Sequence, residues 1–406
     1  MELERESPFQ PRTPVKPENF EGRKDIIKEQ LPLLYQSSQG TPTHFFIKGK
    51  RGIGKTSLAD YFKNIVEVKC KMLPIHVFND GVHDLDSLIQ QIVERILNKV
   101  QTETWGGSII SSFKKHVKSV EFLNTIIEFR PDPETIEFLK DNFPFFLEDI
   151  IKKLDGNKKG LFIIIDDVNG LSDTPEFANW YKSFADTVST EIREMPLAMI
   201  LTSYPENAQK LYNYNPSFNR IFEHIKVQGL HDSEVEEFFT KIFSKLDISI
   251  NDDAMKLMVN FSSGLPNMMQ EIGDGVFWIN NDKIIDNDDA LRGIIKAGTS
   301  IGEKYLQPAL DKSIKSERYL SIFRTLGNDF NGHDIMEEYA FKRKDINEKL
   351  NTKERKAFSD FLKRAKELKI LEYPEGVQQG TYTFTNNLYP IYFLIQYLNF
   401  ETKKKK

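Results

Sequence analysis

A glycine-rich segment that ends in a lysine and a threonine has the clearest chemical pattern in the chain. Residues 49–56, GKRGIGKT, match G-x-x-x-x-G-K-[ST], in which glycines let backbone N–H groups approach phosphate oxygens closely. Lys55 could reach the β- and γ-phosphates of a nucleotide, and the hydroxyl of Thr56 could hold Mg²⁺. The pattern predicts a nucleoside triphosphate site whose loop residues are Gly49, Arg51, Gly52, Ile53, Gly54, Lys55, Thr56 and Ser57.

Two adjacent carboxylates could complete such a site. Residues 160–165, GLFIII, are almost entirely apolar, and Asp166 and Asp167 follow them directly. A continuous apolar run is typical of a strand buried on both faces of a parallel sheet, and ligands bind at the carboxyl ends of such strands. We therefore expect Asp166 to hold the Mg²⁺ shell and Asp167 to orient or deprotonate the attacking water.

The segments around these residues have the patterns of the elements that must position them. Residues 44–47 are β-prone, and apolar residues recur at helical spacing after the loop, so the loop should open a helix whose N-terminus attracts anions. Residues 197–203, LAMILTS, predict another buried strand. Its Thr202 or Ser203 could sense the γ-phosphate or the attacking water, although hydroxyls are also common at strand ends. Together these segments predict an α/β fold with a parallel sheet.

Composition limits the class of protein. The 406 residues are enough for two or three domains, and 39% hydrophobic with 28% charged residues is a globular balance. The formal net charge of −5 means that any nucleic-acid contact must come from a local basic patch. The single cysteine, Cys70, excludes an intrachain disulfide. The polar N-terminus is unlike a signal peptide, and no apolar run could span a bilayer. We expect a cytoplasmic protein with no membrane partner.

The order of these segments resembles the AAA+ and STAND branches of the P-loop ATPases. Residues 20–23, FEGR, match the segment that precedes the first helix in initiator-type and STAND ATPases, and 264–266, GLP, match the family's lid. Residues 166–171, DDVNGL, resemble the signature of a prokaryotic group of AAA+ ATPases similar to origin-recognition initiators. The resemblance covers nearly the whole chain. It implies an AAA+ core, a helical lid and a C-terminal winged helix-turn-helix domain.

The resemblance also implies cofactors and roles for further residues. ATP and Mg²⁺ would bind, with Gly22 and Arg23 near the adenine and Pro266 packing on the base from the lid. Arg220 stands where AAA+ proteins have the arginine finger, which acts on the neighbouring subunit of a homo-oligomer. The alternative for Arg220 is a surface arginine paired with a nearby acid.

Two departures from the family's pattern imply slow hydrolysis. Asp167 stands where typical AAA+ ATPases have glutamate, and no arginine follows Pro266 until Arg292. The chain therefore resembles a slow nucleotide-dependent switch more than a fast motor.

The remaining segments define the expected domains. These are an AAA+ core at 1–229, a lid at 230–313, a winged helix at 314–402 and a basic tail at 403–406. An insertion at about 100–130 could face a partner or could be a surface helical excursion, which is the commoner case.

The expected winged helix has three helices, around 319–323, 333–339 and 358–368, and then a β-hairpin at 370–373 and 381–384. Residues 342–369 contain eleven bases and five acids, a local excess of six positive charges. Such a patch could bind DNA phosphates, and the alternative is a winged helix that binds a protein.

The sequence thus predicts an ATP-binding, slowly hydrolysing AAA+ switch in a DNA-related process such as replication, transposition or anti-phage defence. The alternative is a STAND-like signalling scaffold, in which ATP stabilises an oligomer and the winged helix binds protein.

Overall fold

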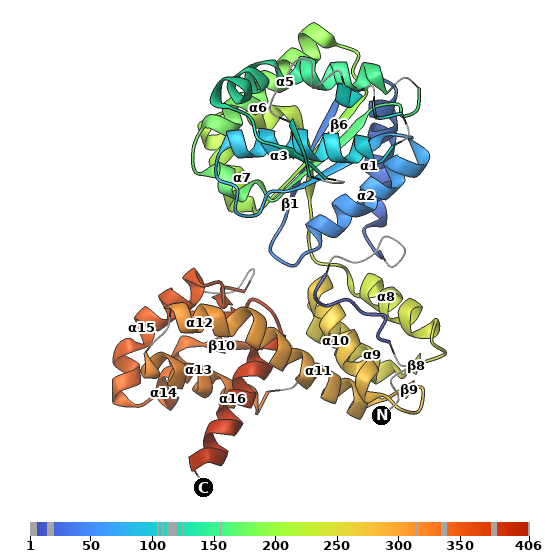
Figure 1. Cartoon of the computed structure of the whole chain (residues 1–406). Helices are drawn as coiled ribbons and strands as arrows, with labels where there is room; N and C mark the ends of the chain where they lie inside the picture. Colours follow the sequence, from blue (N-terminus) through green and yellow to red (C-terminus); the bar gives the residue numbers. More distant parts are fainter. Residues whose placement is uncertain are drawn as a thin grey trace. The chain divides into compact units, whose positions relative to one another are not determined.

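The computed structural model describes residues 6–13, 20–103, 105–107, 109–111, 120–123, 126–154, 156–313, 316–333, 339–374 and 380–404. The chain forms two compact units (Figure 1). The first unit is Val15–Gln228, and the second unit combines Met1–Pro14 with Gly229–Lys406. The finer division of residues 230–402 into lid and winged helix stays a prediction.

A five-stranded parallel sheet is the centre of the first unit, in the order β2-β5-β6-β1-β7. All residues of β5 and β6 are buried, as the apolar runs predict for central strands. Helices lie on both faces of the sheet (Figure 1). The strands are β1 (Thr43–Lys48), β2 (Leu73–Phe78), β5 (Leu161–Asp166), β6 (Leu197–Ser203) and β7 (Phe222–Lys226). The helices are α1 (Lys24–Ser38), α2 (Lys55–Lys69), α3 (Leu85–Gln101), α5 (Pro133–Lys153), α6 (Glu176–Thr187) and α7 (Pro205–Tyr214).

The described part of the expected insertion contains an antiparallel pair, β3 (Val120–Leu123) and β4 (Ile126–Phe129). Asn98 of α3 donates to the carbonyl of Ile127 at 2.8 Å and accepts from its N–H at 2.9 Å. Because Ile127 and Phe129 are fully buried, this strand pair packs on the core and is more than a helical excursion. Residues 112–119 lie outside the described residues, and a partner role for the insertion stays a prediction.

The second unit begins with helices α8 to α12 and one short parallel strand pair. The helices are α8 (Asp232–Ser244), α9 (Asp252–Ser262), α10 (Pro266–Ile279), α11 (Asn287–Ile301) and α12 (Gln307–Ser313). The strands are β8 (Ser249–Ile250) and β9 (Ile284–Ile285).

A three-stranded antiparallel sheet, in the order β10-β12-β11, follows in the second unit. Its elements are α13 (Glu317–Phe330), β10 (Ala340–Lys342), α14 (Arg343–Lys349), α15 (Thr352–Glu367), β11 (Leu371–Glu372), β12 (Thr381–Phe384) and α16 (Leu388–Lys404). The hairpin of β11 and β12 is confirmed. Residues 334–338 of the expected second helix lie outside the described residues, and the short helix that the structure describes is α14, further along the chain.

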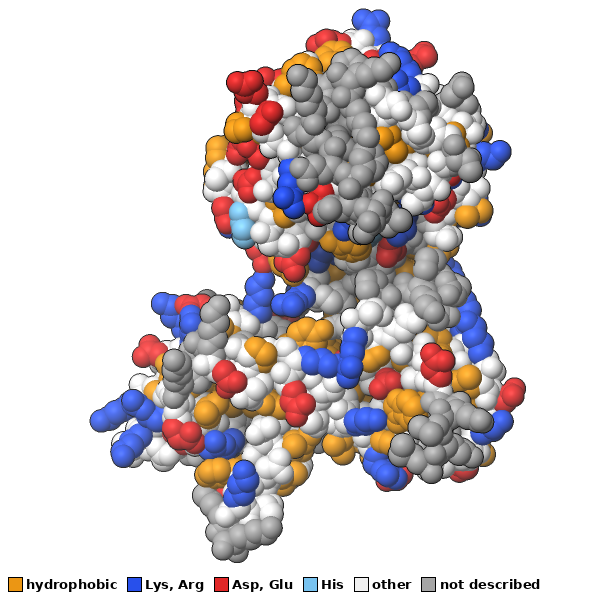
Figure 2. Space-filling model, in the orientation of Figure 1, with side chains coloured by type: hydrophobic (Ala, Val, Ile, Leu, Met, Phe, Trp, Pro, Cys, Tyr) orange, Lys and Arg blue, Asp and Glu red, His pale blue; other side chains and the backbone are white. Residues whose placement is uncertain are grey.

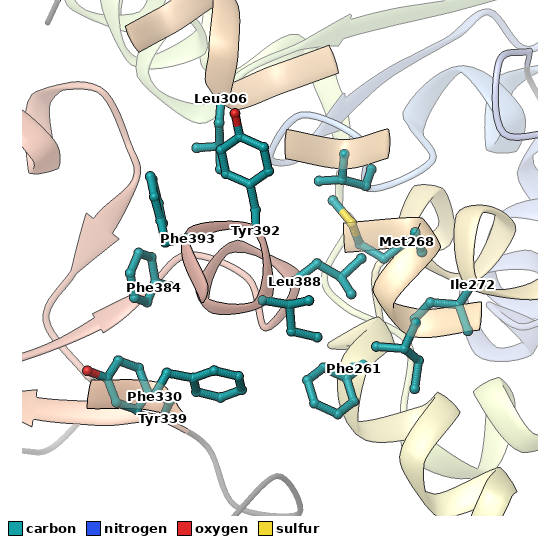
Figure 3. Close-up of a cluster of buried hydrophobic side chains, with 14 of the residues drawn as sticks. Phe261, Met268, Ile272, Leu306, Phe330, Tyr339, Phe384, Leu388, Tyr392 and Phe393 are labelled. Atoms are coloured by element: carbon teal, nitrogen blue, oxygen red, sulfur yellow. The ribbon is translucent and has the colours of Figure 1, made fainter. Parts of the chain in front are cut away.

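One hydrophobic core runs through the second unit (Figure 3). Leu388 of α16 lies near Phe261 of α9 and Met268 of α10, whereas Phe393 of the same helix lies on the side of Phe384 (Figure 3). Helix α16 packs closely against α13 at Gly327. A Cβ at this position would lie only 2.4 Å from the Phe393 carbonyl, so the absence of a side chain allows the close approach.

The N-terminal segment also packs in the second unit. Phe9 is 4% exposed, and its ring centre lies 5.1 Å from that of Phe243 in α8. A Cβ on Gly273 would lie 2.2 Å from the Phe9 ring, so only glycine fits there. The N-terminal segment therefore belongs to the second unit, although the first unit follows it in the sequence. None of the described helices meets the length and hydropathy that a membrane crossing requires.

Candidate nucleotide-binding site

The loop between β1 and α2 depends on its glycines. Gly52 and Gly54 have φ angles of 75° and 90°, in the left-handed region that glycine adopts without steric cost. A Cβ on Gly49 would lie 2.9 Å from the carbonyl oxygen of Val227. The three glycines of the loop are therefore required by the backbone conformation and by close packing, and α2 begins directly after Gly54.

Lys55 lies over its own loop. Its Nζ donates to the carbonyl oxygens of Gly49 at 3.0 Å and Lys50 at 3.1 Å, and it lies 4.5 Å from the ring centre of Tyr204. Burial lowers the pKa of Lys55, although the nearby carboxylates of Asp167 and Asp166 oppose this shift. The ammonium is thus held at the mouth of the loop, close to the acids at the end of β5.

Asp166 brings the expected metal ligands together. Thr56 Oγ1 donates to Asp166 Oδ2 at 2.7 Å, and Thr202 Oγ1 donates to Asp166 Oδ1 at 2.5 Å. Burial raises the pKa of Asp166, but the nearby His76 ring and the hydrogen bonds from Thr202 and Thr56 outweigh it and hold the pKa below its usual value. Asp166 therefore stays ionised, as a ligand of a cation must be.

The hydroxyl of Thr202 bonds to protein groups in the site, whereas a sensor of the γ-phosphate would need it for the nucleotide. Its hydroxyl donates to Asp166 and accepts the N–H of Asp167 at 2.8 Å. The one hydroxyl proton and one lone pair are thus committed to the end of β5. Its expected catalytic role stays a prediction, and these contacts favour positioning of the two acids.

His76 is a site residue that the sequence analysis missed. It lies on β2, beside β5, with Nδ1 3.1 Å from Asp60 Oδ1 and Nε2 3.7 Å from Asp166 Oδ2. Burial lowers the pKa of His76, but the two carboxylates outweigh it and raise the pKa above its usual value. A lone histidine in an otherwise apolar strand was the available signal.

Asn169 is the second missed residue. Its side-chain Oδ1 accepts hydrogen bonds from Ser203 Oγ, the Tyr204 N–H and Asn207 Nδ2, each at 2.9 Å. Its Nδ2 donates to Asp167 Oδ1. The carboxamide therefore links the end of β5 to the end of β6.

The segment expected near adenine contacts the loop. Gly22 and Arg23 have φ angles of 76° and 61°, and Arg23 Nη2 donates to the carbonyl oxygen of Ile53 at 3.2 Å. Phe20 stacks on Tyr61 of α2 with ring centres 4.6 Å apart. The structure thus brings residues 20–23 and the phosphate loop together.

The remaining candidates lie apart or on the surface. Arg220 is exposed in a short 3₁₀ helix, η4 (Phe218–Ile221), and makes no side-chain hydrogen bond or ion pair with the described part of the chain. Arg51 is exposed in the loop, and Ser57 is half-buried in the first turn of α2. Pro266 is the first residue of α10 in the second unit.

These residues fit a nucleotide with Mg²⁺. Among the described residues, no group of three or more His, Cys, Asp or Glu side chains could hold a metal by itself. Mg²⁺ commonly takes one or two protein oxygens and completes its shell with phosphate oxygens and water. The oxygens of Thr56 and Asp166, beside a glycine loop, provide such a partial set.

The parallel sheet and the glycine loop between β1 and α2 have the arrangement of a P-loop nucleotide-binding fold. Models of known protein families do not match the sequence, and neither do the sequences of curated proteins. Solved structures do match. The Walker-type ATPase PABY2304 of Pyrococcus abyssi has a TM-score of 0.54 at 15% identity, over 93% of this chain and 96% of that one. The ORC2 protein of Aeropyrum pernix has a TM-score of 0.54 at 12% identity, over 100% of this chain and 97% of that one.

The α/β fold with a parallel sheet that the sequence predicts is therefore confirmed, and it is shared with the ORC2 protein of Aeropyrum pernix. At these identities the likeness concerns the fold alone. The winged-helix assignment, the roles of the site residues and the partners stay predictions.

Proposed function

We propose that the protein is an ATP-binding, slowly hydrolysing AAA+ switch. The observation that carries the proposal is the convergence of Thr56 and Thr202 on Asp166, beside the glycine loop. Lys55 would neutralise phosphate charge, and Thr56 and Asp166 would hold Mg²⁺. When bound, Mg²⁺ would neutralise charge on the β- and γ-phosphates.

We prefer ATP to GTP for two reasons. Arg23, which follows Gly22, donates to the carbonyl oxygen of Ile53 in the phosphate loop, and the family resemblance expects adenine beside these two residues. The solved ORC2 protein of similar fold was studied as ADPNP and ADP complexes.

Slow turnover follows from the second acid. Asp167 is one methylene shorter than the glutamate of typical AAA+ ATPases, so its carboxylate reaches less far towards an attacking water. An exposed Arg220 with no ion pair among the described residues suits a finger offered to a neighbouring copy in a homo-oligomer. Hydrolysis would then depend on assembly.

The second unit would contact DNA in a cytoplasmic process such as replication, transposition or defence against phage. Its order of helix, strand, two helices and two strands from α13 to β12 is that of winged-helix domains. Lys and Arg side chains gather on the side where α14 and α15 lie (Figure 2). Lys363 of α15 is exposed, whereas Arg364 pairs with Glu367 at 2.9 Å.

Calorimetry of ATP·Mg binding tests the nucleotide site. We expect Lys55→Ala to weaken binding by about tenfold or more, since loss of one charge-assisted contact costs roughly 1.5–3 kcal/mol. Lys69→Ala, at the exposed far end of the same helix, is the matched control and should bind like the parent. Absence of binding heat for the parent would refute the proposal.

Subunit-shared catalysis is tested by mixing two inactive variants. Arg220→Ala lacks the finger and Lys55→Ala lacks the nucleotide site, so mixed oligomers should recover part of the ATPase rate. A mixture as inactive as its components would show that the site is self-contained.

Filter binding with duplex DNA separates the switch from the signalling scaffold. We expect salt-sensitive binding that is lost when Lys363 and Arg364 are both neutralised. No binding at low salt would favour the scaffold, with a protein partner for the second unit.

A further inference from the structure

The side chain of Asn169 has a defined orientation. Three donors converge on one of its terminal atoms, and one of them is the main-chain N–H of Tyr204 at 2.9 Å. Because a main-chain N–H can only donate, that atom must be the carboxamide oxygen. The nitrogen, Nδ2, therefore faces Asp167.

Asn169 provides two donors to one carboxylate oxygen of Asp167. Its Nδ2 and its main-chain N–H both donate to Asp167 Oδ1, the latter at 3.2 Å. The backbone of Asp167 has a φ of 68°, which a residue other than glycine adopts only with support from its surroundings. Within the described part of the chain, Asp167 Oδ2 makes no hydrogen bond. One oxygen is thus fixed, and the other is available as an acceptor.

The same contacts continue to the phosphate loop. Tyr204, whose N–H holds Asn169, places its ring 4.5 Å from Lys55 Nζ. The turn between β6 and α7 therefore contacts both the loop lysine and the residue that fixes the second acid. A rigid turn of this kind keeps Asp167 in register with the loop.

We propose that Asn169 is the positioning residue of the site and that it aims Asp167 Oδ2 at the attacking water. This inference rests on the proposed ATPase function. Only a carboxamide meets both demands, since it accepts from three donors and donates to a carboxylate. Aspartate would keep the acceptor but would set a second negative charge against Asp167, and alanine would provide neither.

The test compares Asn169→Ala and Asn169→Asp with the unaltered full-length protein. For both variants we expect kcat to fall about tenfold or more, while KM and the calorimetric Kd for ADPNP·Mg stay within about threefold. Such a split marks an interaction that acts on the chemical step and not on binding. Gln209→Ala is the control. It removes an exposed hydrogen bond to Asn213 on the same helix as Asn207, and it should leave all three constants unchanged.

A reversed pair keeps the inference testable if the single variants fold poorly. Asp167→Asn combined with Asn169→Asp exchanges the donor and the acceptor, so the unfolding temperature should recover while turnover stays lost. Unchanged kcat in Asn169→Ala, or parallel changes of kcat, KM and Kd, would overturn the inference while the proposed function stands. If the unaltered protein neither binds nor hydrolyses ATP, the proposed function fails and the inference fails with it.

Discussion

The two units hold their important residues in different ways. At the carboxyl end of the first unit's sheet, Asp166 and Asn169 each receive several directional hydrogen bonds from α2, β6 and the start of α7. In the core of the second unit, aromatic rings pack together: Phe323 stacks on Phe393 at 4.3 Å and meets Phe361 edge to face at 4.7 Å, centre to centre. Directional bonds specify atom types, whereas ring packing specifies volume. The carboxyl end of the first unit's sheet should therefore be most sensitive to isosteric polar changes, and the aromatic core around Phe323 to lost volume.

Phe323→Ala tests the volume side of this comparison and should have the largest effect. Phe323 is 1% exposed, and truncation of such a ring costs about 3–5 kcal/mol of unfolding free energy. Urea unfolding followed by tryptophan fluorescence can assign the loss. Trp278 belongs to the second unit, and Trp105 and Trp180 belong to the first.

Single-tryptophan versions of the chain serve as the control for Phe323→Ala. Only the version that keeps Trp278 should show an earlier transition. A loss below about 1 kcal/mol would mean that the ring stack contributes less than ordinary core burial.

Gly273→Ala tests the packing of Phe9, with a smaller expected effect. The new Cβ would meet the Phe9 ring, and overpacking of this kind costs about 1–3 kcal/mol. In a Phe9→Ala background the same change should cost less than about 0.5 kcal/mol, because the obstructing ring is gone.

Thermal or urea unfolding of the parent, the two single variants and the double variant gives the coupling free energy between positions 9 and 273. Gly107→Ala is the control, since nothing lies within 4 Å of the Cβ it would add. Additive effects of the changes at positions 9 and 273 would contradict the packing argument.

The contrast between the units also explains what the sequence could predict. The phosphate loop and the pair of acids after β5 are each a short continuous stretch of sequence, so residue types and spacing alone predict their chemistry. Asn169 and His76 act largely through residues that are distant in the sequence, such as Ser203 and Asp166, and spacing along the chain does not reveal these partners. Thr202 was expected as a sensor, but its hydroxyl contacts Asp166 and Asp167, and only the register of β6 beside β5 brings them together.

Ring packing in the second unit was less predictable still. Phe9 stands in a proline-bearing N-terminal stretch with no periodicity, yet it is buried against α8 and α10. Most of the expected second helix at 333–339 lies outside the described residues, and the sequence analysis missed the strand β10 and the short helix α14 that follow it. Short elements have too few residues for their periodicity to decide between helix and strand.

Asp60 offers a pH test of the polar side of the comparison. Burial opposes the shift, but hydrogen bonds from His76 and Lys63 lower the pKa of Asp60 from 3.8 to about 2. This shift corresponds to at most about 2 kcal/mol, and partial exposure reduces it to about 1 kcal/mol. The folded-state pKa is below the unfolded one, so this stability is complete above pH 3.8 and is lost as the pH falls towards 2.

His76 gives the opposite sign. Its pKa is raised above 6.5, so its contribution is complete below pH 6.5 and is lost as the pH rises through the raised value. The difference in unfolding free energy between the parent and His76→Gln, measured from pH 4 to 9, should therefore shrink on the alkaline side. If this difference does not depend on pH, the charge of protonated His76 does not contribute to stability.

Glu367→Gln should have the smallest effect on stability. It tests an exposed ion pair of the second unit, in contrast to the buried contacts above. Its pair with Arg364 is exposed at both ends, so the unfolding free energy should change by less than about 0.5 kcal/mol. Release of Arg364 adds one charge for phosphate, and log K for DNA should fall more steeply with log salt, by about 0.9 in slope.

The matched control is Glu236→Gln on α8, which makes the same change in net charge at another exposed position. If the effect on DNA comes from net charge alone, the two variants should gain affinity equally. If it comes from Arg364, only Glu367→Gln should change the salt dependence, because counterion release counts the phosphates that a side chain contacts. Equal slopes in filter-binding titrations of the parent and both variants would place the DNA contact away from the C-terminal turn of α15.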